Sequence, residues 1–592
     1  MIMAGLGLVL SIARDALAAQ RYGIDVTSHN IANVNTPGYS RQSPVQVTKE
    51  PAPCGKLLLG RGVDTTQVIR ACDQFVENEL MQKKSGMTSY KEMENYVQIL
   101  EQLFNETSET STSSMLADFW NLWQDISNNP SGDSERIALY RKSEMLSEHF
   151  TRLSEDLTQL GNDLTSAINA GINEINQITD EIAQLNAQIT ATEASSTAND
   201  FRDKRNVLLS KLSQDLNIKA FEQSNGSLTI VTARGCILVN QNSSYHLEVS
   251  GDNGDRVVWH SSGDTTVDIT NYITTGKLGG WLDMRDKILT KYSLDLDALV
   301  KEFIWAVNQQ HAQGVGLEGF STLEGTYAVS STQEELGTLD SGLPYYNKIK
   351  DGTFKIWVYD SSGNVVGEGP TTIFIDANPG GTTLEDLRDT INDKTTNPNL
   401  QNLTATIAQG KLEINADAGF TFAFSDDTSN VLPALGINTF FQGSSAGSIA
   451  VNPMMDNKDF IAAAQIDTDG SFTSGDNTNA IAIAGLQHIS TDIPEWTCNR
   501  VNGNTEGSIT ATIEGYYRSM VGSIGIVSQN ISRAKDFNEA MVNRLSEIRD
   551  SVSGVSLDEE IANLMKYQHA YSAAAKLISI SDEMLNTLLN VK

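Results

Sequence analysis

The stretch LSEHFTRLSEDLTQLGNDLTSAINAGINEINQITDEIAQLNAQI, residues 146–189, determines the fold class of this chain. Its large apolar residues recur at steps of three and four, the spacing of one face of an α-helix. They are Leu146, Phe150, Leu153, Leu157, Leu160, Leu164, Ile168, Ile172, Ile175, Ile178, Ile182, Leu185 and Ile189. The helical pattern begins near Ser134 and predicts one helix of roughly 80–90 Å. We therefore expect a helical rod, with a shorter helix from Asp203 to Leu216 returning along it.

Both ends of the chain also carry helical patterns. At the N-terminus, apolar residues follow a coiled-coil seam; they are Leu6, Leu10, Leu17, Ile24 and Ile31. Gly23 costs about 1 kcal/mol relative to alanine, so this helix should be marginal alone. The run Thr36-Pro37-Gly38 ends it.

A second seam lies at the C-terminus, where the chain ends inside an apolar helix. Its members are Ile561, Leu564, Tyr571, Ile578 and Leu585. Each seam taken separately is typical of a core-facing helix in an ordinary globular domain. The two seams together with the rod favour an architecture with both termini at one end of a helical stem.

The middle of the chain alternates between strand and helix patterns. Residues 39–85 read as irregular or hairpin-like, and residues 217–273 show the period of two that indicates short strands. A helical pattern covers residues 276–312, and residues 350–445 are again rich in strands around one helix at Leu384–Ile391. The helical pattern resumes near Ala480 and runs from about Ile509 to the end.

We predict an α+β multidomain protein with terminal coiled-coil helices, a long helical rod and β-rich inserted outer domains. Six segments follow from the patterns. They are residues 1–85, an N-terminal helix and irregular segment; 86–216, the rod; 217–319, a β-rich part and helix completing the stem; 320–445, a β-rich outer insertion; 446–508, a linker and return segment; and 509–592, C-terminal helices that pair with the N-terminal ones.

The charge of the chain bears on its partners. The net charge is −32, which argues against nucleic acid and against an anionic membrane surface. Residues 1–85 hold nine Lys and Arg against seven Asp and Glu, whereas residues 320–510 hold eight against 24. A nearly neutral end can pack against copies of itself, while an acidic middle stays solvated. No window predicts a membrane-spanning helix, and the apolar start lacks the basic residues of a cleaved signal peptide.

Motifs for catalysis, cofactors or metals are weak throughout. Gly443-Ser444-Ser445-Ala446-Gly447 fits the nucleophile-elbow pattern but lies in a Gly- and Ser-rich stretch followed by Pro453. Asp467-Thr468-Asp469-Gly470 begins like a calcium loop, yet Phe472 and Thr478 replace the glycine and glutamate that such a loop needs. The four cysteines have no metal-ligand or disulfide pattern. We predict no catalytic, cofactor-binding or metal-binding residues, no cofactor, and no enzyme.

The N-terminal run from Gly23 to Gln42, GIDVTSHNIANVNTPGYSRQ, resembles the signature of bacterial flagellar rod, hook and hook-associated proteins. Its shared core is Asn30-Ile31-Ala32-Asn33 with Asn35-Thr36 and Gly38-Tyr39. The continuation Ser40-Arg41-Gln42 is similar to members at the junction of hook and filament. The C-terminal runs VSGVSLDEE, residues 552–560, and DEMLNTLL, residues 582–589, resemble the closing segment of the same members.

This resemblance to the flagellar axial family implies a structural protein that is exported without a cleaved signal by a type III apparatus. It implies assembly into an extracellular tube, with hook protein on one side, the next junction protein on the other, and an export chaperone. The implied assembly interface comprises Leu6, Leu10, Leu17, Ile24, Asn30, Ile31, Asn33, Asn35, Gly38, Tyr39, Ile561, Leu564, Tyr571, Ile578 and Leu585. Other axial proteins (hook, rod or second junction protein) and a surface adhesin using the β-rich insertion are the alternatives.

Overall fold

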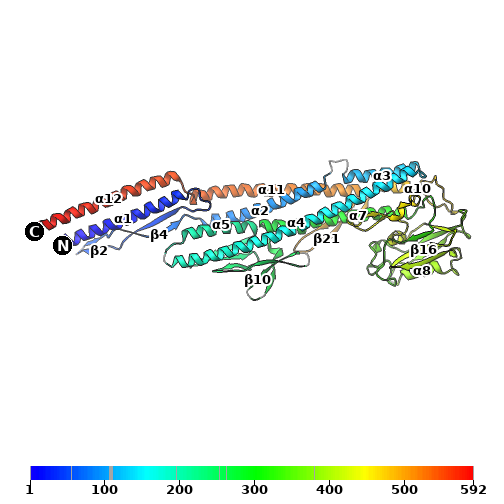
Figure 1. Cartoon of the computed structure of the whole chain (residues 1–592), viewed down its shortest axis with the longest axis horizontal. Helices are drawn as coiled ribbons and strands as arrows, with labels where there is room; N and C mark the ends of the chain where they lie inside the picture. Colours follow the sequence, from blue (N-terminus) through cyan, green and yellow to red (C-terminus); the bar gives the residue numbers. More distant parts are fainter. Residues whose placement is uncertain are drawn as a thin grey trace. The chain divides into compact units, whose positions relative to one another are not determined.

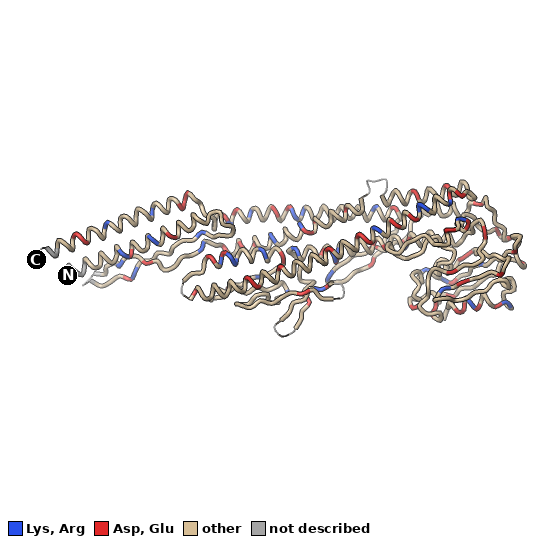
Figure 2. Tube along the Cα trace, viewed as in Figure 1, with Lys and Arg blue, Asp and Glu red and all other residues tan. Residues whose placement is uncertain are grey.

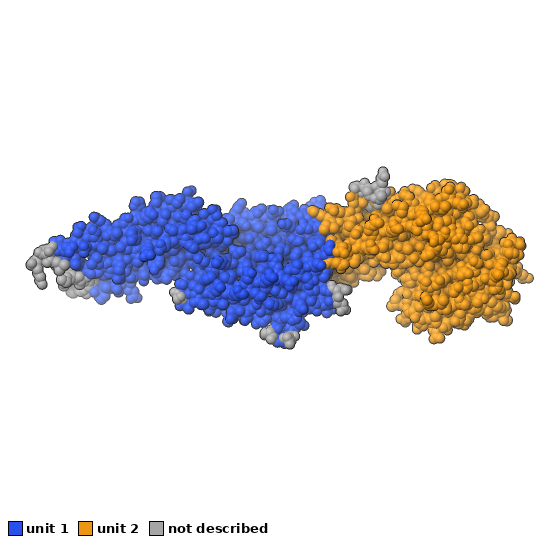
Figure 3. Space-filling model, in the orientation of Figure 1, with its two compact units in different colours: residues 1–96, 163–285, 528–592 blue, residues 97–162, 286–527 orange. Residues whose placement is uncertain are grey.

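The computed structural model describes residues 2–590 except 55–56, 106–110, 195, 252–253, 262, 264 and 379. The chain forms two compact units, shown in different colours in Figure 3. Unit 1 comprises residues 1–96, 163–285 and 528–592, and unit 2 comprises residues 97–162 and 286–527. Each unit is therefore assembled from segments far apart in sequence, a division that a pass along the sequence does not reveal.

The long helix predicted from the leucine and isoleucine pattern is α4, Asp133–Glu193, of 61 residues. Every predicted apolar position from Leu146 to Ile182 on it is buried. The returning helix is α5 (Asn199–Asp215), which lies antiparallel to the end of α4 (Figure 1). Arg205 of α5 is fully buried and donates to Asn186 of α4 and to the Gly226 carbonyl. Both helix predictions are confirmed.

Two small sheets of unit 1 dock on α4 through asparagine side chains. The first contains β5 (Ile218–Glu222), β6 (Leu228–Thr232), β7 (Ile237–Asn240) and β8 (Ser243–Ser244), paired in that order. The second contains β9 (Leu247–Ser250), β10 (Arg256–His260) and β11 (Thr266–Asp268). Asn186 exchanges hydrogen bonds with the backbone of Leu228, and Asn176 does the same with Leu247. The amides satisfy strand groups that burial would otherwise leave without partners.

The core of unit 1 lies between these sheets and the helices. The isoleucines of α4 pack there with Leu278 and Leu282 of α6 (Gly276–Asp283) and with the inward residues of β6 and β7. Helix α2 (Gln74–Leu103) lies beside them, and Trp281 donates to Glu92 of α2 at 3.1 Å. The sequence pattern thus identified one side of this core, while the strands supply the other.

The chain termini form a separate part of unit 1 (Figure 1). Helix α1 (Ile2–Ala32) contacts α12 (Leu557–Asn590), and also the hairpin of β1 (Gln42–Thr48) and β4 (Val63–Arg70). A small hairpin of β2 (Ala52–Cys54) and β3 (Leu57–Leu59) extends from it. The hairpin-like interpretation of residues 39–85 is therefore correct up to Arg70, and α2 begins at Gln74. Helix α11 (Ile513–Ser553) precedes α12.

Unit 2 is built around an aromatic core. Helices α3 (Thr112–Asn128) and α7 (Thr290–His311) contribute rings to it, and α10 (Thr478–Gly485) contacts both helices. Phe119 contacts Trp120, Trp123, Phe303, Phe440 and Phe441 with ring centroids 4.9–6.5 Å apart. Edge-to-face pairs of this kind add to the free energy gained by burying the rings.

The predicted β-rich insertion forms two three-stranded sheets. One has the order β14 (Thr371–Ile375), β13 (Gly352–Tyr359), β17 (Thr421–Ser425). The other has the order β12 (Thr322–Glu324), β16 (Lys411–Ala416), β15 (Leu403–Ala408), with α8 (Leu384–Asn392) against β15. Long helices, paired termini and inserted sheets confirm the predicted α+β fold class.

Other parts of unit 2 depart from the patterns read in the sequence. The Gly443–Gly447 run forms the turn between β18 (Phe441–Gln442) and β19 (Ala450–Val451), so it lacks the helix that a nucleophile elbow requires. At the calcium-like stretch, Asp469 accepts hydrogen bonds from Ser471 in a tight turn. Between α10 and α11 lies a hairpin of β20 (Thr491–Thr497) and β21 (Thr505–Ala511), where the sequence predicted a linker and return segment.

Within the described parts of the chain, no helix is long and apolar enough to cross a membrane, and no cluster of three or more potential ligands could hold a metal ion. Cys72, Cys236 and Cys498 are free thiols.

Candidate assembly site at the paired termini

Helices α1 and α12 pack against one another through small and polar residues. The buried positions of α12 are Glu560, Ala574 and Ser581, and the ring of Tyr567 lies between Glu560 and Ala574 at the same seven-residue spacing. This is a heptad in which the largest side chain is one tyrosine. Small side chains let the two helix backbones approach closely.

Gly23 of α1 makes room for that tyrosine. A Cβ atom at this position would lie 2.6 Å from the Tyr567 ring. From the sequence, Gly23 is only a weak point of the helix, whereas the structure shows a packing reason for the missing side chain. The neighbouring buried residues of α1 are also small or polar: Ala13, Ala19, Thr27 and Asn30.

Asn30 uses the full hydrogen-bonding capacity of its amide at this site. Its Nδ2 donates to the Gln42 carbonyl and to Glu560 Oε2, both at 2.9 Å. Its Oδ1 accepts from the Tyr39 hydroxyl at 2.7 Å and from the Gln42 amide at 3.0 Å. Two donors and two acceptors in this geometry require asparagine, because leucine offers none and aspartate cannot donate when ionised.

Glu560 connects the C-terminal helix to the same motif. Its side chain is 3% exposed and lies 2.8 Å from the Arg41 guanidinium, which also contacts the exposed Glu559 at 2.9 Å. The Arg41 backbone amide donates to the Ser553 carbonyl. The carboxylate is thus paired with a cation and accepts from Asn30, which offsets the cost of burying its charge. We call Asn30, Tyr39, Arg41, Gln42 and Glu560 the terminal joint.

Helix α5 completes the surroundings of the terminal joint. Asp203 accepts from the Ser40 amide and pairs with Arg70, and Asp200 accepts from the Gln42 side chain. Burial and the nearby carboxylates of Asp200, Asp203 and Glu560 raise the pKa of Tyr39 above its usual range. The phenol therefore stays protonated and donates to Asn30.

The remaining motif residues shape the turn between α1 and β1. Asn33 donates to the His29 carbonyl and accepts from Thr36, while Asn35 is exposed. Gly38 has a φ of 78°, and a Cβ there would lie 2.2 Å from Val207 of α5. Glycine is required at this position by both conformation and space.

The large apolar residues of the two predicted seams are less buried than their small neighbours. Leu6, Leu10, Leu17, Ile24 and Ile31 of α1 are half-buried, as are Leu564 and Ile578 of α12. Ile561, Tyr571 and Leu585 are exposed in the single chain, together with Met565, Leu577, Ile580 and Met584. Three acidic residues lie at the start of α12, and its other charged residues are spaced along the helix between the apolar ones (Figure 2). The intrachain contact leaves an apolar surface on α12 uncovered.

Known protein families match this chain at both of its ends, which form the terminal joint, and in its helical region. Residues 10–39 match the family of flagella basal body rod proteins, and residues 550–591 match the C-terminal family of flagellar basal body rod FlgEFG proteins. Residues 97–324 match the helical domain of flagellar hook-associated protein FlgK. The chain belongs to the bacterial flagellar axial proteins. Its two ends carry the general axial signature, and its helical domain is specific to the hook-associated group.

Full-length relatives agree with this assignment. The axial protein is 24% identical to flagellar hook-associated protein 1 of Bacillus subtilis (strain 168), covering 98% of this chain and 97% of the relative. It is 26% identical to the protein of that name from Salmonella typhimurium and 25% to that from Escherichia coli (strain K12), with 99% of this chain and 100% of each relative covered. The chain is thus a structural component of the flagellum of the hook-associated protein 1 type.

A solved structure shares the fold. The flagellar hook junction protein FlgK from Burkholderia pseudomallei superposes with a TM-score of 0.52 at 18% identity, covering 80% of this axial protein and all of that chain. At this identity the likeness concerns the fold alone.

Proposed function

We propose that this axial protein assembles through its paired terminal helices into a tubular segment between hook and filament. The observation that carries the proposal is the terminal joint, in which Asn30, Arg41 and Glu560 bind segments more than 500 residues apart in sequence. The joint fixes α1 against α12, and the pair then presents its uncovered apolar residues together. Such a surface is unfavourable in water and is stabilised when neighbouring subunits cover it.

The proposed interface comprises the fifteen residues predicted from the sequence, with a division of roles among them. Asn30, Asn33, Gly38 and Tyr39 shape the joint within one chain. Ile561, Tyr571 and Leu585 are exposed and would contact neighbouring subunits, together with the half-buried seam residues of α1. Hook protein would lie on one side of the segment and the next junction protein on the other.

The route to the assembly is also part of the proposal. Export by a type III apparatus without a cleaved signal, with an export chaperone, would deliver the chain to the growing flagellum outside the cell. The six segments predicted from the sequence would then serve as two paired ends, a stem and a solvent-facing insertion at residues 320–445. The names of the relatives denote flagellar components and no catalytic activity, so we propose a structural protein and no enzyme.

The decisive experiment is deletion of the gene followed by motility measurements and electron microscopy. We expect hooks without filaments, and restoration of filaments by the full-length chain. A complementing chain with Asn30→Ala should be secreted and yet restore few filaments. Normal filaments in the deletion strain would contradict the proposal.

A further inference from the structure

Strand β5 is an open edge of its four-stranded sheet. It pairs with β6 on one side, and its other side has no strand within the described part of the chain. The Gln223 amide donates to the Ser227 carbonyl, whereas the Thr232 and Leu228 amides donate away from β5, to the Cys236 carbonyl and to Asn186. In an antiparallel pair the hydrogen-bonded positions alternate. Ile218, Ala220 and Glu222 therefore direct their backbone N–H and C=O groups outward.

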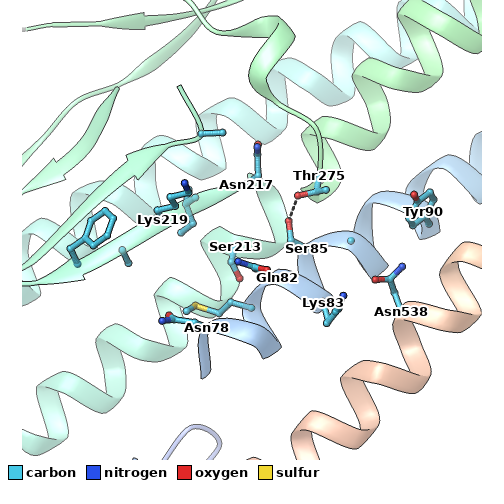
Figure 4. A pocket seen from close by; sticks show the side chains of 16 residues that line it. Asn78, Gln82, Lys83, Ser85, Tyr90, Ser213, Asn217, Lys219, Thr275 and Asn538 are labelled. Atoms are coloured by element: carbon cyan, nitrogen blue, oxygen red, sulfur yellow. Dashed lines mark hydrogen bonds between the residues drawn. The ribbon is translucent and has the colours of Figure 1, made fainter. Parts of the chain in front are cut away.

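The outward edge borders a groove with an unusual charge. A cavity of about 590 Å³ lies between β5, the end of α5, α2 and α11 (Figure 4). The described residues that line it include Lys83 and Lys219 and no Asp or Glu. The chain as a whole has 74 Asp and Glu against 42 Lys and Arg, so an acid-free groove with two lysines stands out against the average surface.

Hydrogen-bonding side chains point into the same groove. Asn78 and Gln82 of α2 lie opposite Asn217 and Lys219, and Asn538 of α11 lies at the other end (Figure 4). The Oδ1 atom of Asn217 is buried without a hydrogen-bond partner among the described residues. Phe221 is 57% exposed at the end of the strand and offers an apolar contact.

We propose that β5 binds an extended acidic peptide segment of another protein by strand addition. The peptide backbone would bond to the outward groups of Ile218 and Ala220, as an added strand does at an open edge. Its carboxylates would face Lys83 and Lys219. This inference goes beyond the proposed function, because the groove lies outside the terminal joint and the seams of α1 and α12.

Fluorescence anisotropy with the full-length protein tests the proposal. The probe is a labelled ten-residue peptide of alternating threonine and glutamate, and the reference is the same peptide with lysine in place of glutamate. We expect the acidic peptide to bind, and its binding to weaken with added salt. We expect the basic peptide not to bind. Lys83→Glu with Lys219→Glu should weaken binding at least about tenfold. The matched control is Lys91→Glu, an exposed lysine of α2 outside the groove.

A second variant separates strand addition from simple charge attraction. Ala220→Pro removes one outward N–H while keeping the bonds between β5 and β6, and Ala220→Gly keeps that N–H. We expect about tenfold weaker binding for the proline variant than for the glycine variant, at equal melting temperatures. Equal binding of the acidic peptide by both variants would overturn the proposal. So would a peptide affinity that, like the affinity for inorganic polyphosphate, does not change with Ala220→Pro. So would equal binding of the acidic and basic peptides.

Discussion

At the scale of single residues, Glu560 and Glu559 offer a matched pair in the terminal joint. Glu560 is buried and bonds to both Asn30 and Arg41, whereas the side chain of Glu559 is 62% exposed and bonds to Arg41 alone. Glu560→Ala should weaken the pairing of α1 with α12 by about 1.5–3 kcal/mol, because hydrogen bonds to a buried charge are lost. Glu559→Ala should change it by less than about 1 kcal/mol. Counts of filaments on complemented cells measure the effect, and equal counts would exclude a special role for Glu560.

His311 makes unit 2 sensitive to acid. It is fully buried, hydrogen-bonds to the Asn438 carbonyl through Nδ1 and accepts from the Ala462 amide through Nε2. Burial lowers its pKa to about 4. The unfolded chain, with a pKa near 6.5, therefore binds a proton first as pH falls. Stability should be complete above pH ~6.5 and should fall by roughly 3 kcal/mol towards pH ~4.

Urea unfolding of the purified protein between pH 7.5 and 4 tests the His311 prediction. The variant His311→Gln should be less stable at neutral pH but should lose less stability on acidification. His488→Gln removes an exposed histidine of the same unit and should leave the pH dependence unchanged. An unaltered pH slope in His311→Gln would show that another group controls the transition.

At the scale of secondary-structure elements, the sequence predicted the helices better than the surfaces they use. The apolar period of α4 is unambiguous because its buried face consists of large aliphatic residues. In α12 the apolar residues surround the helix, so the period could not identify the face against α1. That face carries Glu560, Tyr567 and Ala574. Its first residue, Glu560, lies one position before Ile561, where the predicted seam begins.

The hydrogen bonds of the candidate site could not be predicted from the sequence, for a different reason. The motif containing Asn30 and Tyr39 could be recognised, but the partner of Asn30 is Glu560, which lies 530 residues away. No period links these two positions, and their meeting depends on the pairing of α1 with α12. Asp200 and Asp203 of α5 also had no local signal, since acidic residues near the start of a helix are common.

Two glycines of α1 test the close approach of α1 and α12. Gly23→Ala should weaken the pairing, because the new Cβ would overlap the Tyr567 ring and overpacking costs about 1–3 kcal/mol. This exceeds the gain of about 1 kcal/mol in helix propensity. Gly7→Ala has the same gain, and among the described residues no atom outside its own stretch of helix lies within 4 Å of the new Cβ. Filament counts should fall for Gly23→Ala alone and recover when Tyr567→Ala is added; failure to recover would remove Tyr567 as the cause.

At the scale of the whole molecule, the terminal helices and unit 2 should differ in protection against hydrogen exchange. The uncovered apolar residues of α12 and the small residues between α1 and α12 give the pair little burial within one chain. Unit 2 has a large aromatic core of its own. Free monomer should therefore exchange quickly within residues 1–40 and 560–592 and slowly in unit 2. Strong protection of both terminal segments in the monomer would show that the pair is stable without neighbouring subunits.

Charge placed on α12 separates contact within one chain from contact between subunits. Leu577 is 46% exposed, whereas Ile578 next to it is half-buried. Ile578→Asp should weaken the pairing with α1, and Leu577→Asp should leave that pairing intact. Both variants should nevertheless abolish filaments, because an unpaired carboxylate buried between subunits costs several kcal/mol in every copy. Neither should change the melting temperature of unit 2, which lacks these helices. Filaments on cells with Leu577→Asp would mean that the exposed side of α12 faces solvent in the assembly, and the subunit contacts would then have to come from other surfaces of the chain.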